Sequence, residues 1–79
     1  MITIKDLLNK IKWDKKENPE DYVISYYDRI VNKLVHLKFK EIQIKDTYII
    51  LIKEDEEINI PLHRIRKVAK KGNVIWERK

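Results

Sequence analysis

The hydrophobic positions near the N-terminus are spaced as they are on one face of a helix. The apolar residues follow an i, i+3, i+4, i+7 pattern: Ile4, Leu7, Leu8 and Ile11. Thr3 can cap the first turn, and Asp6 stands three residues further on, as in a capping box. Trp13 would lie away from the apolar stripe if the helix continued. We therefore predict an amphipathic helix over residues 3–12 that ends at Trp13, whose ring either folds back as a lid or stays partly exposed.

Beyond residue 21 the pattern changes to the alternation that is typical of β-strands. Runs rich in Tyr, Val and Ile are separated by turn residues. The predicted strands cover residues 22–29, 34–39, 46–53, 58–60, 65–70 and 73–78. Gly72 favours a tight turn between the last two, because glycine tolerates positive φ. The alternation is imperfect over residues 64–70, which predicts a β-bulge there.

The strand predicted at residues 46–53 is apolar on both faces, so both faces need a cover. The N-terminal helix supplies one cover, and a curving sheet supplies the other. In the last hairpin we expect four core contacts: Ile65, Val68, Val74 and Trp76. All connections are short enough for a meander. The predicted fold class is therefore α+β, with one N-terminal helix packed on a curved, barrel-like antiparallel sheet of five or six short strands in a single domain, residues 1–79.

Composition excludes several classes of function. The chain has 79 residues and no cysteine, which removes disulfides, zinc knuckles and thiol catalysis. The apolar run at residues 48–52 is far shorter than the ~20 residues of a membrane-spanning helix. The acidic turn at residues 54–57 lacks the spaced, glycine-kinked loop of calcium sites. We expect a cytoplasmic protein with no metal, no cofactor and no membrane association.

The net charge of +5 is unevenly distributed along the chain. Residues 62–79 carry seven Lys and Arg residues against Glu77 alone, a net charge of +6, whereas residues 1–61 carry −1. A local basic field of this kind attracts polyanions. A solvated basic hairpin in a lysine-rich protein would have the same composition.

His63 and Arg64 form the most informative pair of polar residues. A guanidinium presents a planar fork that suits two phosphate oxygens, and a neighbouring imidazole can donate to a third. In the structural alternative, His63 caps a backbone carbonyl and Arg64 pairs with Asp14 or Asp28. A catalytic role for His63 with His36 would require two imidazoles to meet. No spacing in the sequence brings them together, and His36 reads as an ordinary surface residue of a strand.

Aromatic residues beside basic ones can hold unpaired bases, because the ring stacks on the base while the cation meets the phosphate. Trp13 can serve in this way, whereas Trp76 reads as core. Tyr26 and Tyr27 point to opposite faces of their strand, so one of them faces away from the core unless both faces are covered. The chain has no phosphate-cradling glycine-rich loop and no Ser-His-Asp pattern, and we do not expect an enzyme.

Taken together, these motifs resemble a family of small, mostly archaeal proteins labelled RNA cyclic-group-end recognition domain. The resemblance spans nearly the whole chain and is carried by these segments: residues 4–14, 19–22, 27–29, 60–65 and 72–78. The most specific of them is Ile-Pro-Leu-His-Arg-Ile at residues 60–65, in combination with Trp76. The positions that match the family's motif are Trp13, Asp14, Arg29, His63, Arg64 and Trp76. The resemblance implies recognition of RNA ends that carry a 2′,3′-cyclic phosphate, and the lysine-rich stretch 67–71 adds charge that such recognition does not require.

Two functions from different classes follow. The first is a non-catalytic RNA-binding module for single-stranded RNA or its 3′ end, acting in RNA processing or repair, with a protein of RNA processing as a further partner. Its predicted RNA- and phosphate-binding residues are His63, Arg64, Arg29, Arg66, Lys70, Lys71 and Trp13. The second is a protein-interaction or scaffold domain without RNA affinity of its own. A phosphoesterase that uses His63 is a third alternative.

Overall fold

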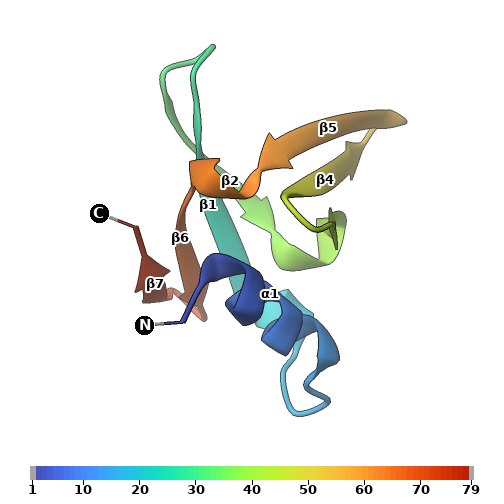
Figure 1. Ribbon diagram of the computed structural model, residues 1–79, viewed down its shortest axis with the longest axis vertical. Coiled ribbons are helices and arrows are strands. Elements are labelled where there is room, and N and C mark those ends of the chain that lie inside the picture. The colour runs from blue at the N-terminus through green and yellow to red at the C-terminus, as the bar shows by residue number, and fades with distance from the viewer. Residues whose placement is uncertain (1, 79) are drawn as a thin grey trace.

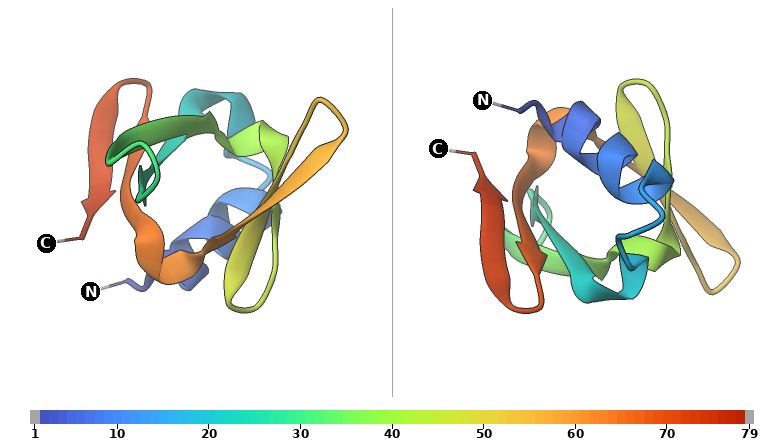
Figure 2. Two further views of the ribbon diagram at one scale, coloured as in Figure 1. Left: turned by 90° about the horizontal axis from the view of Figure 1, so that it is seen from above. Right: turned by 90° about the horizontal axis from the view of Figure 1, so that it is seen from below.

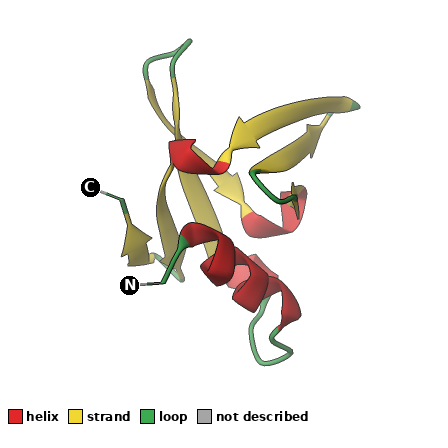
Figure 3. Cartoon of the chain, in the orientation of Figure 1, coloured by secondary structure: helices red, strands yellow, loops and turns green. Residues whose placement is uncertain are grey.

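The computed structural model describes residues 2–78, which form one α-helix, seven β-strands and three short 3₁₀ turns (Figures 1 and 3). The elements are, in order, α1 (Ile4–Trp13), η1 (Pro19–Asp21), β1 (Tyr22–Asp28), β2 (Lys33–Lys38), η2 (Phe39–Glu41), β3 (Ile42–Ile44), β4 (Tyr48–Lys53), β5 (Glu56–Pro61), η3 (Leu62–Arg64), β6 (Ile65–Lys70) and β7 (Asn73–Glu77). The predicted α+β class is confirmed. The predicted strand number was too low, because the short strand β3 lies where only a change of direction was expected.

Helix α1 begins and ends through local hydrogen bonds. The Thr3 side chain accepts a hydrogen bond from the Asp6 amide at 3.2 Å, which confirms the predicted cap. At the other end the Asp14 amide donates to the Lys10 carbonyl at 2.9 Å, while Asp14 itself adopts an extended conformation. The helix therefore stops at Trp13, as predicted. The Trp13 side chain does not fold back as a lid, since the residue is 73% exposed.

The strands form two separate antiparallel sheets. Their strand orders are β2-β1-β6-β7 and β3-β4-β5. The predicted meander is wrong, because β1 pairs with β6 instead of pairing only with its sequence neighbour. The sheets do not close into a barrel, so that detail of the prediction is not confirmed. The turns η2 and η3 carry the chain from one sheet to the other, and each replaces a continuous strand by a corner.

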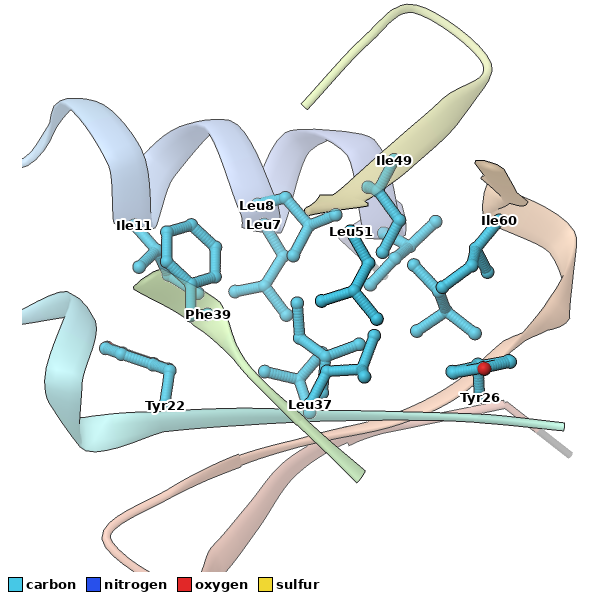
Figure 4. Packing of buried hydrophobic residues seen from close by; sticks show 14 residues of the cluster. Leu7, Leu8, Ile11, Tyr22, Tyr26, Leu37, Phe39, Ile49, Leu51 and Ile60 are labelled. Atoms are coloured by element: carbon cyan, nitrogen blue, oxygen red, sulfur yellow. The ribbon is translucent and has the colours of Figure 1, made fainter. Parts of the chain in front are cut away.

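The two sheets and α1 surround one hydrophobic core, as the views along the long axis show (Figure 2). The helix contributes the four residues of its predicted stripe, and each sheet contributes its inner face (Figure 4). The side chains with the least exposure come from all three: Leu8, Ile11, Ile24, Ile49, Ile65 and Val68. Burying such a side chain stabilises a fold by about 1.5–3 kcal/mol. The core is thus one cluster with three walls.

Burial along the outer strands is less complete than the sequence suggested. In β4 the side chains of Ile49 and Leu51 are buried, but Ile52 is 45% exposed, so the prediction of a strand buried on both faces is wrong. The β4–β5 hairpin projects away from α1, and the helix cannot cover its outer end (Figure 1). Val74 is also exposed, because it lies on the edge strand β7. Ile65 and Val68 are buried as predicted, and Trp76 packs against the core.

The predicted bulge is present, and the pairing is irregular at two places. The register between β1 and β6 shifts between Ser25 and Tyr26, and the register between β6 and β7 shifts between Val68 and Ala69. A bulge bends the strand and increases its twist. Strand β6 therefore changes which of its side chains face outward near its start, where it follows η3.

The packing of β1 predicts the effect of one methylene group. Ile24→Val removes one methylene group from a side chain that has no exposed area. The substitution should lower the free energy of unfolding by about 0.5–1.5 kcal/mol. Urea denaturation followed by circular dichroism measures the change. Ile30→Val is the matched control, because Ile30 is 94% exposed at the β1–β2 turn. Equal effects of the two substitutions would contradict this description of the core.

Candidate nucleic-acid interface

The turn η3 is fixed by backbone hydrogen bonds on both sides. The Leu62 amide donates to the Thr47 carbonyl at 3.1 Å, and the Ile65 amide donates to the Leu62 carbonyl. Pro61 precedes the turn with φ of −59°, the value its ring imposes. The turn presents His63 to solvent and leaves Arg64 half-buried. The turn therefore holds the adjacent side chains of His63 and Arg64 at the corner where the chain passes from β5 to β6.

Arg64 lines a cavity of about 220 Å³ between the β1–β2 and β4–β5 hairpins. The other lining residues are Tyr26, Asp28, Ile30, Ile58, Asn59 and Ile60. The Arg64 Nε is buried and has no hydrogen-bond partner among residues 2–78, and no ion pair joins Arg64 to a carboxylate in that part of the chain. Buried donors are nearly always paired. The alternative in which Arg64 forms an ion pair with Asp14 or Asp28 is therefore not observed within residues 2–78.

A second, shallower cavity lies on the outer face of the four-stranded sheet. We call it the sheet-face hollow; its volume is about 470 Å³, and its lining residues are Tyr27, Leu34, Arg66, Lys67, Glu77 and Arg78. The Arg66 guanidinium lies over the Tyr27 ring, 5.9 Å from its centroid. Successive residues of a strand point to opposite faces. Tyr26 and Tyr27 therefore place the Arg64 cavity and the sheet-face hollow on opposite sides of the same end of β1.

Arg78 connects the sheet-face hollow to η3. Its Nε donates to the Ile65 carbonyl at 3.2 Å and its Nη2 donates to the Leu62 carbonyl at 3.3 Å. The same guanidinium lies over the Trp76 ring, 5.4 Å from its centroid. These contacts fix the orientation of the Arg78 guanidinium and hold the backbone of η3 in place. Arg78 is thus a positioning residue for His63 and Arg64 as well as part of the hollow.

Lys70 and Lys71 lie at the opposite end of the molecule, where each meets an acid. The Lys70 ammonium is 3.1 Å from Glu17, and the Lys71 ammonium is 3.9 Å from Asp21. The Tyr22 hydroxyl also donates to Glu17. Hydrogen bonds from Tyr22 and Lys70 lower the pKa of Glu17, and the hydrogen bond with Glu17 raises the pKa of Lys70. Burial, followed by the same carboxylate, raises the pKa of the Tyr22 hydroxyl. Contact of Lys70 and Lys71 with RNA stays a prediction. The carboxylates of Glu17 and Asp21 partly compensate the charges of these two lysines.

The remaining predicted residues divide between the two ends. Arg29 is exposed in the β1–β2 turn and Arg66 is the second residue of β6, close after η3, whereas Trp13 is the last residue of α1. The structure therefore brings together His63, Arg64, Arg66 and the β1–β2 hairpin, and it separates them from Trp13, Lys70 and Lys71. His36 lies on β2, where its Nδ1 is 2.6 Å from the Ser25 Oγ, and no hydrogen bond joins it to His63 among the described residues.

Three residues of the sheet-face hollow were missed by the reading of the sequence: Tyr27, Lys67 and Arg78. Alternation along the first strand showed that Tyr27 and Tyr26 face opposite ways but not which of them faces outward. The positions of Lys67 and Arg78 depend on the pairing of β6 with β1 and β7, which no local pattern encodes. Within residues 2–78 there is no group of three or more His, Asp or Glu side chains placed to hold a metal ion. No helix in that range is long and apolar enough to span a membrane.

The fold and the two cavities define a small α+β protein whose arginine and lysine side chains lie on both sides of one end of β1. Comparison with known proteins places it further: the family model described as MJ1316 RNA cyclic group end recognition domain matches residues 1–78, and the chain belongs to this family. It is 37% identical over 78 residues to a UPF0248 protein of Saccharolobus islandicus, with 95% of this chain and 98% of the relative covered. It is 40% identical to a UPF0248 protein of Metallosphaera sedula, with 98% and 94% covered, and 34% identical to one of Methanococcus maripaludis, with 96% and 99% covered. No solved structure gives a significant match.

The contacts of Glu17 predict how stability depends on pH. The pKa of Glu17 is lowered in the folded protein, so its contribution is fully present above the ordinary value of 4.5 and is lost as the pH falls through the lowered value. Urea unfolding of the wild type and of Glu17→Gln should therefore show the wild type to be more stable at pH 7, with the difference shrinking toward pH 3. A difference that stays constant over this range would show that the carboxylate charge makes no contribution.

Proposed function

We propose that this protein is a non-catalytic RNA-binding module that recognises RNA 3′ ends bearing a 2′,3′-cyclic phosphate. The observation that carries the proposal is the pair of cavities on the two sides of β1. Arg64, whose neighbour His63 is exposed, lines one of them, and Tyr27, Arg66 and Arg78 line the other. The description of the family supports it, since it names the recognition of RNA cyclic group ends. An RNA end is a polyanion, and residues 62–79 are the basic part of the chain.

Arg64 is the residue to which we assign the terminal phosphate. A cyclic phosphate has two free oxygens that share one negative charge, and a guanidinium can donate to both of them. His63 is exposed beside it on the same turn and can donate to an oxygen from outside the cavity. Asn59 and Tyr26 line the cavity and add neutral donors.

Asp28 lines the same cavity and makes the site selective for charge. Its Oδ1 already accepts the Ile30 amide at 2.8 Å, which holds the carboxylate in place. A fixed carboxylate repels each negative charge that is added beside it. A cyclic phosphate carries one charge, whereas a phosphate monoester carries about −1.5 to −2 at pH 7. The arrangement therefore favours the cyclic end over an opened 3′-phosphate.

The sheet-face hollow fits the nucleotides that precede the end. Tyr27, with the Arg66 guanidinium over its ring, offers a stacking surface for a base. Arg66, Lys67 and Arg78 offer cations to the backbone phosphates. Their single acidic neighbour in the hollow is Glu77, which lies opposite Lys67 in the strand register.

End recognition predicts a difference between RNAs that share one sequence. Fluorescence anisotropy with a short single-stranded RNA should give at least tenfold tighter binding, about 1.4 kcal/mol, to a 2′,3′-cyclic phosphate end than to a hydroxyl end. A 3′-monophosphate end should bind more weakly than the cyclic end, and Asp28→Asn should reduce that difference. Equal binding to all three ends would leave a general nucleic-acid surface. Absence of binding would favour the alternative, a protein-interaction domain.

The assignment of residues predicts two kinds of loss. Arg64→Lys keeps the charge but loses the planar fork, so the preference for the cyclic end should disappear while binding to the hydroxyl end persists. Arg66→Ala should weaken binding to every RNA and reduce the slope of log affinity against log salt by about 0.7. Lys53→Gln, an exposed charge on β4 that lines neither cavity, is the control and should change little. Urea unfolding of each variant separates lost contacts from lost stability.

The module is proposed to bind the cyclic phosphate without opening it, because the second histidine, His36, is hydrogen-bonded to Ser25 and does not form an acid–base pair with His63. RNA with a cyclic end should therefore be recovered intact after prolonged incubation with the protein. Hydrolysis that is lost in His63→Ala would overturn this part of the proposal and assign a phosphoesterase.

A further inference from the structure

A third cavity lies beside the C-terminal turn of α1, and the proposed end recognition does not use it. It has a volume of about 440 Å³ and lies between the last turn of α1, η1 and the segment that runs from η2 through β3 (Figure 1). Three lysines line it: Lys12 from α1, Lys40 from η2 and Lys45 after β3. We call it the lysine cavity. Its volume is within the range of sites for small organic groups.

The charge of the lysine cavity is not a consequence of the basic tail. It is built from the first 61 residues, whose net charge is −1, yet no acidic residue lines it. Lys40 is 3.5 Å from the exposed carboxylate of Glu20, and Lys12 and Lys45 have no ion pair within residues 2–78. A lysine near the end of a helix is favoured by the helix dipole, which accounts for Lys12 but not for the other two.

The walls of the cavity combine apolar surface with one amide. Phe39 and Ile42 supply apolar surface, and the exposed Gln43 supplies both a donor and an acceptor. Such a lining accommodates a flat heteroaromatic ring, since the apolar side chains contact its face while the amide reaches its edge. The lysines around it are then placed for the phosphates on either side.

Trp13 follows the cavity residue Lys12 in α1, does not itself line the cavity and is not part of the hydrophobic core. It is the most exposed of the large aromatic side chains, and the ammonium of Lys12 lies 5.2 Å from its ring centroid. A tryptophan offers 150–250 Å² of mostly apolar surface, so leaving it in water forgoes stabilisation that burial would give. The other tryptophan, Trp76, packs against the core and donates from its Nε1 to the Ile2 carbonyl.

We propose that the lysine cavity and Trp13 form a second contact site for single-stranded RNA, which holds a nucleotide upstream of the end bound at η3. One base stacks on Trp13 or enters the cavity against Phe39, and the adjoining phosphates lie against Lys12 and Lys45. This inference rests on the proposed function, because the strand at the second site is the one whose terminus is recognised at η3. No residue of the lysine cavity also lines either of the two cavities near η3, so only an RNA with nucleotides beyond those bound near η3 can occupy both sites together.

The test compares two single-stranded RNAs that both end in a 2′,3′-cyclic phosphate, a dinucleotide and a dodecanucleotide. The dodecanucleotide should quench the fluorescence of Trp13, and the dinucleotide should not. The contribution of Trp13 is the part of the quenching that is lost in the Trp13→Phe variant. Trp13→Ala should weaken binding of the dodecanucleotide roughly tenfold and leave the dinucleotide unaffected. Lys12→Gln/Lys45→Gln should reduce the salt slope for the dodecanucleotide by about 1.4.

The matched control is Lys15→Gln/Lys53→Gln, which removes the same charge from two exposed lysines that do not line the cavity. It should change the affinity for the dodecanucleotide much less than Lys12→Gln/Lys45→Gln does. Equal effects of the two double variants, or a dodecanucleotide that leaves Trp13 unquenched, would overturn the second site. If the second site is overturned but both RNAs still bind more tightly with a cyclic end than with a hydroxyl end, the proposed function stands without the second site. If neither RNA binds, both proposals fail together.

Discussion

Strand β1 is hydrogen-bonded on both sides, to β2 along one edge and to β6 along the other, and the rest of the structure depends on this position. Its inner face contributes Tyr22, Ile24 and Tyr26 to the core, and its outer face ends in Tyr27. The pairing with β6 also brings the basic segment 62–79 next to the β1–β2 hairpin. The same set of backbone hydrogen bonds therefore builds the core and assembles the cationic end.

The local elements of the fold were predictable because local interactions determine them. The helix depends on its cap at Thr3 and on an apolar stripe, and the last hairpin depends on Gly72 and the alternation around it. Which strands pair was not predictable in the same way. Periodicity shows which face of a strand is apolar, but it does not name the partner strand. The β1–β6 pairing joins Tyr22 to Lys70 and Tyr26 to Ile65, so it depends on contacts between distant parts of the chain.

The candidate site shows the same division. Residue type alone pointed to His63 and Arg64, because a guanidinium beside an imidazole suits a phosphate whatever the rest of the fold does. Arg78 could not be found in this way. Its importance lies in two carbonyl groups of η3 and β6, and these come within reach only once β7 has paired with β6. The count of basic residues also overstated the cationic field, since Lys70 and Lys71 meet Glu17 and Asp21.

Two open sheets expose four strand edges, which a closed barrel would not have. An unpaired edge is a template for another chain, and proteins protect it by shortness, by charge or by proline. Strand β3 has only three residues, β5 begins with Glu56 and Glu57 and ends at Pro61, and β2 has a lysine at each end. Strand β7 is the least protected, because exposed Val74 and Ile75 lie on it. Three of the four edges are thus protected, and resistance to edge-to-edge aggregation depends most on the fourth edge, that of β7.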